Sequence, residues 1–149
     1  MRTYIIIASL VVILGIAGLA WSQYQHAAPP ADTTITVAAA QPQIVILDPS
    51  HDFGRVRYGD VSHHTFTISN TGAAPLVIEG VSTSCGCTSA EVSTTDIPAG
   101  GSADLIVSFD PAVHKDDTDL GPLTRTIYVD TNDPEQPEVE AKIYADVYK

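Results

Sequence analysis

Residues 138–148, Glu-Val-Glu-Ala-Lys-Ile-Tyr-Ala-Asp-Val-Tyr, form the longest strictly alternating stretch of the sequence. Every second residue is apolar, and the residues between them are charged or aromatic. Because successive side chains of a β-strand point to opposite faces of a sheet, the apolar residues share one face. They are Val139, Ala141, Ile143, Ala145 and Val147. The stretch therefore predicts a half-buried strand with one face against a hydrophobic core.

Shorter alternating or apolar runs precede it, and most end at turn-forming residues. The runs are residues 43–47, 64–68, 76–78, 105–109 and 127–129. The turn residues that follow four of them are Asp48-Pro49, Asn70-Thr71-Gly72, Asp110-Pro111 and Asn132-Asp133-Pro134. Residues 43–149 show no apolar stripe of helical period. Many short strands with frequent turns are typical of an antiparallel sandwich, so we expect an all-β, immunoglobulin-like domain of about seven strands.

The N-terminus predicts a membrane helix over residues 1–21. From Ile5 to Ala20 there is no charged residue, and Tyr4 and Trp21 flank the run. At about 1.5 Å per residue this span reaches roughly 27 Å, close to the ~30 Å hydrocarbon core of a bilayer. Arg2 favours a cytoplasmic N-terminus and an exported remainder, which in a bacterial envelope means the periplasm. A cleaved signal peptide, and hence a secreted protein, is the alternative, because residues 18–20 (Gly-Leu-Ala) resemble a cleavage site.

Composition distinguishes a linker from the domain and makes one class of partner, nucleic acid, unexpected. Residues 22–42 are rich in Ala, Pro, Thr and Gln, show no sustained period, and predict a flexible tether between the helix and the domain of residues 43–149. The chain has 7 Lys and Arg against 18 Asp and Glu, a net charge of −11. Such a surface repels phosphate backbones, so nucleic acid is not an expected partner.

Six stretches resemble, in order and spacing, those of the bacterial domain of unknown function 1573. They are residues 51–54 (His-Asp-Phe-Gly), 64–72, 75–78, 84–88 (Ser-Cys-Gly-Cys-Thr), 97–100 and 131–134 (Thr-Asn-Asp-Pro). The turns with Asn-Thr-Gly (70–72) and Asn-Asp-Pro (132–134) also occur in Ig-like domains of the Hydin and major sperm protein types. The resemblance covers nearly all of the exported domain. It implies a seven-to-eight-stranded sandwich and assigns no activity.

Cys85 and Cys87 are the only cysteines, and a single glycine separates them. If the segment were extended, their Cα atoms would lie roughly 6.5–7 Å apart, at the far edge of the range for a disulfide. Gly86 lets the chain bend and bring the sulfurs together. The residues leave three interpretations open: a buried pair or local disulfide, a reversible dithiol, and two ligands of a Cu(I) or Zn(II) site.

The histidines give weaker signals. His63 and His64 are consecutive on a predicted strand and should point to opposite faces, so they cannot bind one ion together. His64 shares a face with Phe66 and is expected to be partly buried. His51 and His114 fall in predicted loops, and either could approach the cysteines in the fold.

The acidic segment with Asp116, Asp117 and Asp119 faintly resembles a calcium loop. It lacks the EF-hand spacing and the distal glutamate, so an acidic solvated loop is expected. No nucleophile elbow, phosphate loop or metalloprotease motif is present either. We therefore expect no enzyme activity and assign no catalytic or cofactor-binding residue.

Together these patterns predict a membrane-tethered, extracytoplasmic Ig-like domain that binds another protein of the cell envelope, without a cofactor. The alternative is a thiol-redox or Cu(I)/Zn-binding module in which Cys85 and Cys87 act as the redox pair or as metal ligands.

The anchor prediction can be tested by carbonate extraction of membranes. Because the uncharged span is long enough to cross the bilayer, the full-length protein should stay in the membrane fraction. Recovery of a soluble form that begins at Trp21 would instead show that the segment is a cleaved signal peptide.

Overall fold

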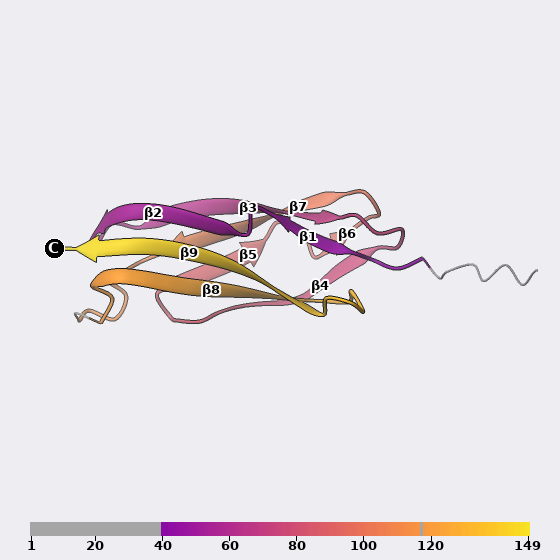
Figure 1. Ribbon diagram of the computed structural model, residues 1–149. Coiled ribbons are helices and arrows are strands. Elements are labelled where there is room, and N and C mark those ends of the chain that lie inside the picture. The colour runs from indigo at the N-terminus through magenta and orange to yellow at the C-terminus, as the bar shows by residue number, and fades with distance from the viewer. Residues whose placement is uncertain (1–39, 117) are drawn as a thin grey trace, which may run out of the picture. The chain divides into compact units, whose positions relative to one another are not determined.

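The computed structural model describes residues 40–116 and 118–149, and every regular element in these ranges is a β-strand (Figure 1). The predicted membrane helix over residues 1–21 and most of the predicted tether lie outside the described residues. No helix within the described ranges is long and apolar enough to cross a membrane. The all-β prediction for the domain is confirmed.

Nine strands in the described residues form two sheets that pack as a sandwich. The first sheet has the order β1-β3-β7-β5 and the second the order β2-β9-β8-β4-β6. The strands are β1 (Ile44–Leu47), β2 (Ser50–Arg57), β3 (Ser62–Asn70), β4 (Leu76–Thr83), β5 (Thr88–Val92), β6 (Asp96–Ile97), β7 (Ser102–Phe109), β8 (Gly121–Thr131) and β9 (Glu138–Tyr148).

The alternating runs of the sequence become the strands that form most of the core. β9 covers the longest run, and its predicted inward set is buried from Ala141 to Val147, with Val139 partly buried. These residues share one hydrophobic core with buried residues of β3, β7 and β8, among them Phe66, Leu105 and Ile127. The burial of alternate apolar residues on both sheets thus follows the pattern read from the sequence.

Three strands were not predicted, which is why the structure has more than the expected seven. β2 has a single buried residue, Val56, and Gly54 interrupts it with a positive φ of 65°. β5 is an edge strand of the first sheet, and β6 has only two residues. The alternation of β2 is interrupted by a register shift between Asp52 and Arg55. β5 does alternate, with Ala90 and Val92 packed against the core, but its five residues hold only these two apolar side chains.

The prediction of a purely antiparallel sandwich is wrong at one pair, because β2 runs parallel to β9. After β1 pairs with β3, the chain turns at Asp48, which has a positive φ of 48°, and crosses at Pro49 to the other sheet. The N–H of Ser50 bonds to the carbonyl of Asp48 at 2.7 Å in this turn. The crossing lets two consecutive segments belong to different sheets, as Figure 1 shows for β1 and β2.

Two buried polar side chains fasten the end of the sandwich where the chain enters. The side-chain oxygen of Asn70 accepts hydrogen bonds from the N–H groups of Gln43 (3.2 Å) and Gly72 (3.0 Å). Its amide nitrogen donates to the carbonyls of Ala74 (2.8 Å) and Ile97 (3.0 Å). One asparagine therefore satisfies main-chain groups from the residue before β1, the β3–β4 turn and β6.

Asp133 does the same from the β8–β9 turn. One carboxylate oxygen accepts from the N–H of Ile44 at 2.9 Å, and the other accepts from Glu135 (2.9 Å) and Gln136 (3.3 Å). Burial acts to raise the pKa of Asp133, but the three N–H groups outweigh it and hold the pKa below its usual value. The ionised carboxylate thus ties β1 to the second sheet.

Replacing this carboxylate should destabilise the domain in a pH-dependent way. We expect Asp133→Asn to lower the free energy of unfolding by about 1–3 kcal/mol at pH 7. Because the folded-state pKa is depressed, the stabilising contribution is present above pH ~4 and is lost as the pH falls through the folded-state pKa. Urea unfolding at pH 7 and pH 3 should therefore show a smaller difference between wild type and variant at the lower pH.

The exposed Asp60 provides the matched control, and Asp60→Asn should change the free energy of unfolding by no more than about 0.5 kcal/mol. A loss at Asp133 that is the same at both pH values would contradict the assignment to its charge.

Candidate functional site

The turn between β4 and β5 holds the two cysteines, which are joined by a disulfide. The Cα atoms of Cys85 and Cys87 lie 5.3 Å apart, closer than in an extended segment. The Thr83 hydroxyl lies 3.0 Å from the carbonyl oxygen of Cys85 and 2.9 Å from that of Thr88, and so spans the turn. Of the interpretations left open by the sequence, the structure displays the local bridge.

The two sulfurs of this bridge differ in their surroundings. Cys87 is 2% exposed and belongs to the core, whereas Cys85 is only partly buried. The hydroxyl of Thr88 lies 3.4 Å from the Cys85 sulfur and 3.9 Å from the Cys87 sulfur. An approaching molecule would therefore meet Cys85 first.

A guanidinium group contacts the buried sulfur. Nε of Arg125, which lies on β8, donates to the Cys87 sulfur at 3.1 Å. The Nη2 atom of Arg125 donates to Oδ1 of Asp119 at 2.6 Å, and Oδ2 of Asp119 lies 2.8 Å from Nδ1 of His114. The Asp119 side chain is 2% exposed and that of Arg125 19%. The buried carboxylate is thus paired with a positive charge that reaches the disulfide.

His114 completes the cluster above the cysteine turn. A Cβ atom placed on Gly86 would lie 3.4 Å from Nε2 of His114, so the imidazole stands directly over the glycine between the cysteines. Of the histidines that the sequence left open, His114 is the one that lies beside the bridge. Its loop position is confirmed. We name this group of Cys85, Cys87, His114, Asp119 and Arg125 the disulfide cluster.

The prediction of a solvated acidic loop is wrong for Asp119, which is buried and bonded on both oxygens. It holds for Asp116, which is exposed; a side-chain and a backbone hydrogen bond from Thr118 lower the pKa of Asp116. Asp117 lies outside the described residues. No set of three or more His, Cys, Asp or Glu side chains within the described ranges is arranged to hold a metal ion. With the bridge closed, Cys85 and Cys87 also offer no thiolate ligands.

The other histidines form a separate aromatic group. His64 lies on β3, facing the same side as Phe66 as predicted, while His63 points to the outer surface. His51, expected in a loop, lies instead on β2, and its ring stacks on His64 with centroids 3.7 Å apart. Burial, and then the neighbouring His51, lower the pKa of His64.

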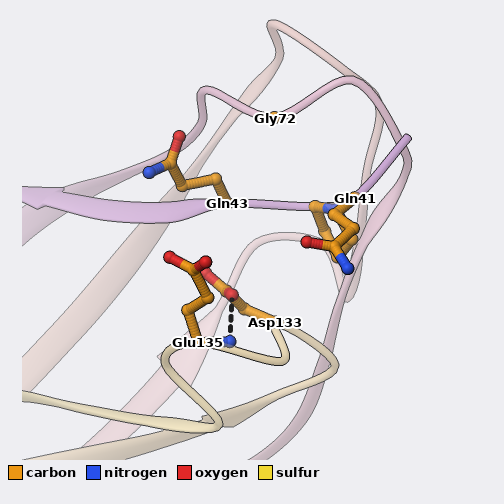
Figure 2. A pocket seen from close by; sticks show the side chains of 6 residues that line it. Gln41, Gln43, Gly72, Asp133 and Glu135 are labelled. Atoms are coloured by element: carbon orange, nitrogen blue, oxygen red, sulfur yellow. Dashed lines mark hydrogen bonds between the residues drawn. The ribbon is translucent and has the colours of Figure 1, made fainter. Parts of the chain in front are cut away.

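A small pocket lies at the end where the chain enters the domain. It encloses about 180 Å³ and is lined by Gln41, Pro42, Gln43, Gly72, Asp133 and Glu135 (Figure 2). Its Asp133 is already occupied by main-chain N–H groups, one of which is the dashed bond to Glu135 in Figure 2. The polar groups here serve the fold, so we assign the pocket no ligand.

A larger groove runs between β1 and the beginning of β9. It encloses about 430 Å³ and is lined by Ile44, Val45, Ile46, Pro49, Gln136, Glu138, Val139 and Glu140. We call it the β1–β9 groove. The sequence did not predict this groove. It forms because β1 pairs with β3 and not with β9, and no motif shows where the chain then crosses to reach β9.

The domain matches a known family over nearly its whole length. The model of DUF1573, a protein of unknown function, matches residues 44–147. The chain belongs to the DUF1573 family. No curated protein matches the sequence.

Solved structures place this DUF1573 domain among Ig-like and PapD-like folds. A protein of unknown function from Porphyromonas gingivalis W83 is 28% identical with a TM-score of 0.65, over 76% of this chain and 51% of that one. The chain therefore spans about half the length of that relative. PapD-like domain 7 of human CEP192 is 11% identical (TM-score 0.55, covering 73% and 87% of the two chains), and the YadV chaperone is 12% identical (TM-score 0.52, covering 71% and 52%). The last two show likeness of fold alone.

The bridge closes a ring too small to stabilise the fold greatly. The chain-entropy relation gives roughly 1.6 kcal/mol for this loop. The double variant Cys85→Ser/Cys87→Ser should therefore stay folded and lose no more than about 2 kcal/mol in urea unfolding. If the variant does not fold, or if it loses the whole free energy of unfolding of the wild type, the bridge is required for the fold and this prediction is wrong.

Proposed function

We propose that this DUF1573 protein is an exported, membrane-tethered, non-catalytic module that binds an extended segment of another cell-envelope protein in the β1–β9 groove. The observation that carries the proposal is the open main-chain edge of β9 beside an apolar floor. A partner strand added to such an edge gains hydrogen bonds from the main chain and specificity from side-chain contacts.

The register of the sheet shows which groups of β9 face the groove. The N–H of Thr131 bonds to the carbonyl of Pro137, and the pairing continues through Val129 with Val139. In an antiparallel ladder the residues between these pairs turn their N–H and C=O groups the other way. Glu138 and Glu140 therefore direct their main-chain groups away from β8 and toward the groove.

β2 joins β9 only after this point. The first contact is the 2.9 Å hydrogen bond from the N–H of Lys142 to the carbonyl of Pro49, and the register starts with Ser50 opposite Lys142. The edge of β9 over residues 138–141 is therefore left facing the groove. A short partner strand placed there would lie in line with β2.

β1 forms the opposite wall. The N–H of Thr71 bonds to the carbonyl of Gln43, so the main-chain groups of Ile44 and Ile46 point away from β3. The N–H of Ile44 donates to Asp133 at 2.9 Å, and its carbonyl accepts from the Gln136 side chain at 3.3 Å. Those contacts close one end of the groove and leave the main chain of Ile46 facing it.

The chemistry of the walls indicates the kind of partner. Ile44 is buried, and Ile46 and Val139 pack partly buried against the core, so they offer an apolar floor. Glu138 and Glu140 have exposed side chains beside it, on a chain of net charge −11. An extended segment with alternating apolar and basic residues complements both features.

The remaining parts of the proposal come from the N-terminal sequence. A helix over residues 1–21 and a tether over 22–42 would hold the domain on the extracytoplasmic side of the membrane, where its partner would be an envelope protein. The Ig-like fold of the domain supports a binding role rather than a catalytic one.

A proline at the groove edge should abolish strand addition, while alanine at the same position should not. Glu140→Pro removes an N–H that β8 does not use, so the sheet should tolerate it. We expect a peptide with alternating Val and Lys to bind the wild type, measured by fluorescence anisotropy. Glu140→Pro should weaken binding at least about tenfold, and Glu140→Ala no more than about threefold.

A peptide of the same composition with its valines and lysines in separate blocks provides the control for charge attraction. Hydrogen exchange should show new protection at the amides of Glu138 and Glu140 only with the alternating peptide. Equal weakening by both substitutions, or equal binding of both peptides, would contradict strand addition.

A further inference from the structure

We propose that the disulfide cluster is a thiol–disulfide exchange site whose substrate is a dithiol. Cys85 is the sulfur that a substrate thiolate attacks, and Arg125 holds the Cys87 sulfur that departs. This inference is independent of the β1–β9 groove, because it depends only on residues of the β4–β5 turn, the loop before β8, and β8 itself.

The unequal exposure of the two sulfurs sets the direction of attack. Exchange depends on which sulfur is attacked and on access to it. Cys85 is partly buried at the surface, and Cys87 is 2% exposed behind it. A thiolate from solvent therefore reaches Cys85 and expels the inner sulfur.

Arg125 is placed to favour that departure. Its Nε lies 3.1 Å from the Cys87 sulfur, which carries negative charge once the bond breaks. Hydrogen bonds to charged groups are stronger than neutral ones, and a nearby arginine stabilises a thiolate. Asp119 accepts a hydrogen bond from Arg125 (2.6 Å) and contacts Nδ1 of His114 (2.8 Å), and these contacts hold the guanidinium in this position.

The exchange balances without a further reactant. The first thiolate of the dithiol forms a bond to Cys85 while the Cys85–Cys87 bond breaks, and the electron pair goes to Cys87. The second thiolate of the dithiol then attacks the dithiol sulfur that is bonded to Cys85, and Cys85 leaves as a thiolate. The dithiol is oxidised by two electrons, the bridge is reduced, and the two cysteines take up the two protons that the dithiol gave up.

The spacing of the cysteines explains why the substrate has two thiols. Cys87 is separated from Cys85 by Gly86 alone, so its thiolate stays beside any mixed disulfide formed on Cys85. The effective concentration of so close a group is high, and it expels a monothiol again. A dithiol completes the reduction because its second thiol competes from within the same mixed disulfide.

Two single variants of the full chain test which sulfur reacts. Cys87→Ser leaves Cys85 free, and Cys85→Ser leaves Cys87 free. With glutathione disulfide as the probe, Cys85 should form the mixed disulfide at least about tenfold faster than Cys87, as followed by intact mass. Equal rates, or a faster reaction of Cys87, would overturn the proposal.

Arg125 is tested by the rate at which dithiothreitol reduces the native bridge. Arg125→Gln should slow the reduction roughly tenfold, and Arg125→Lys, which keeps the charge, should stay within about threefold of wild type. If Arg125 were only structural, its replacement would loosen the turn and expose the bridge, so the rate of reduction would rise instead of fall. Faster or unchanged reduction in Arg125→Gln would therefore overturn the role of Arg125.

Arg125→Gln leaves the buried Asp119 without its cation and could unfold the domain. The double variant Asp119→Asn/Arg125→Gln removes both charges and keeps the test valid, with folding checked by thermal unfolding. Slow reduction should persist in the double variant. With glutathione alone, the mixed disulfide on wild type should not accumulate; its accumulation would contradict the requirement for a dithiol.

Discussion

The crossing of the chain at Asp48 and Pro49 is the constraint on which the rest of the sandwich depends. β1 stays hydrogen-bonded to β3 in one sheet, and after only two intervening residues β2 begins its parallel pairing with β9 in the other. Asp48 accepts a left-handed backbone conformation (φ 48°) to make this turn, which aspartate tolerates better than most residues. Because β2 can reach β9 only after the crossing, the first residues of β9 keep an open edge. The β1–β9 groove is thus a direct result of how the two sheets share one continuous segment.

The motifs in the turns serve this arrangement. Asn70 and Asp133 are almost fully buried, yet their side chains bond to main-chain groups of β1, of two turns and of β6. Every buried side-chain nitrogen or oxygen in the described part of the chain has a hydrogen-bond partner. A buried polar group without a hydrogen-bond partner costs more free energy than a typical hydrogen bond contributes. These asparagine and aspartate turns therefore hold β1 at the entrance of the domain, and the pocket in Figure 2 lies between them without needing a ligand to satisfy its polar atoms.

The sequence predicted what depends on local pattern and missed what depends on pairing. Alternation identified β9 and its inward face, and consecutive positions on one strand separated His63 from His64. β2 was missed because the irregularity at Gly54 shifts its inward positions and breaks the alternation before Val56, and His51 was therefore placed in a loop. The cysteine pair was recognised from its spacing. Arg125 was not, since it reaches Cys87 across 38 residues, from β8 to the β4–β5 turn. Asp119 looked solvated because its partners, His114 and Arg125, are an ordinary histidine and arginine in the sequence.

The two proposed sites lie toward opposite ends of β8, which explains how one small domain can hold both. Arg125 is near the start of β8, where it pairs with Ile143, while the groove lies beside Glu138, which pairs with Asp130 at the far end. The chain enters the domain at the groove end, next to Gln43, and β9 ends at the other (Figure 1). A strand bound along residues 138–141 would therefore leave Cys85 uncovered. Binding and thiol exchange can act on the same partner only if that partner extends along β9 and carries its thiols beyond the segment that fills the groove.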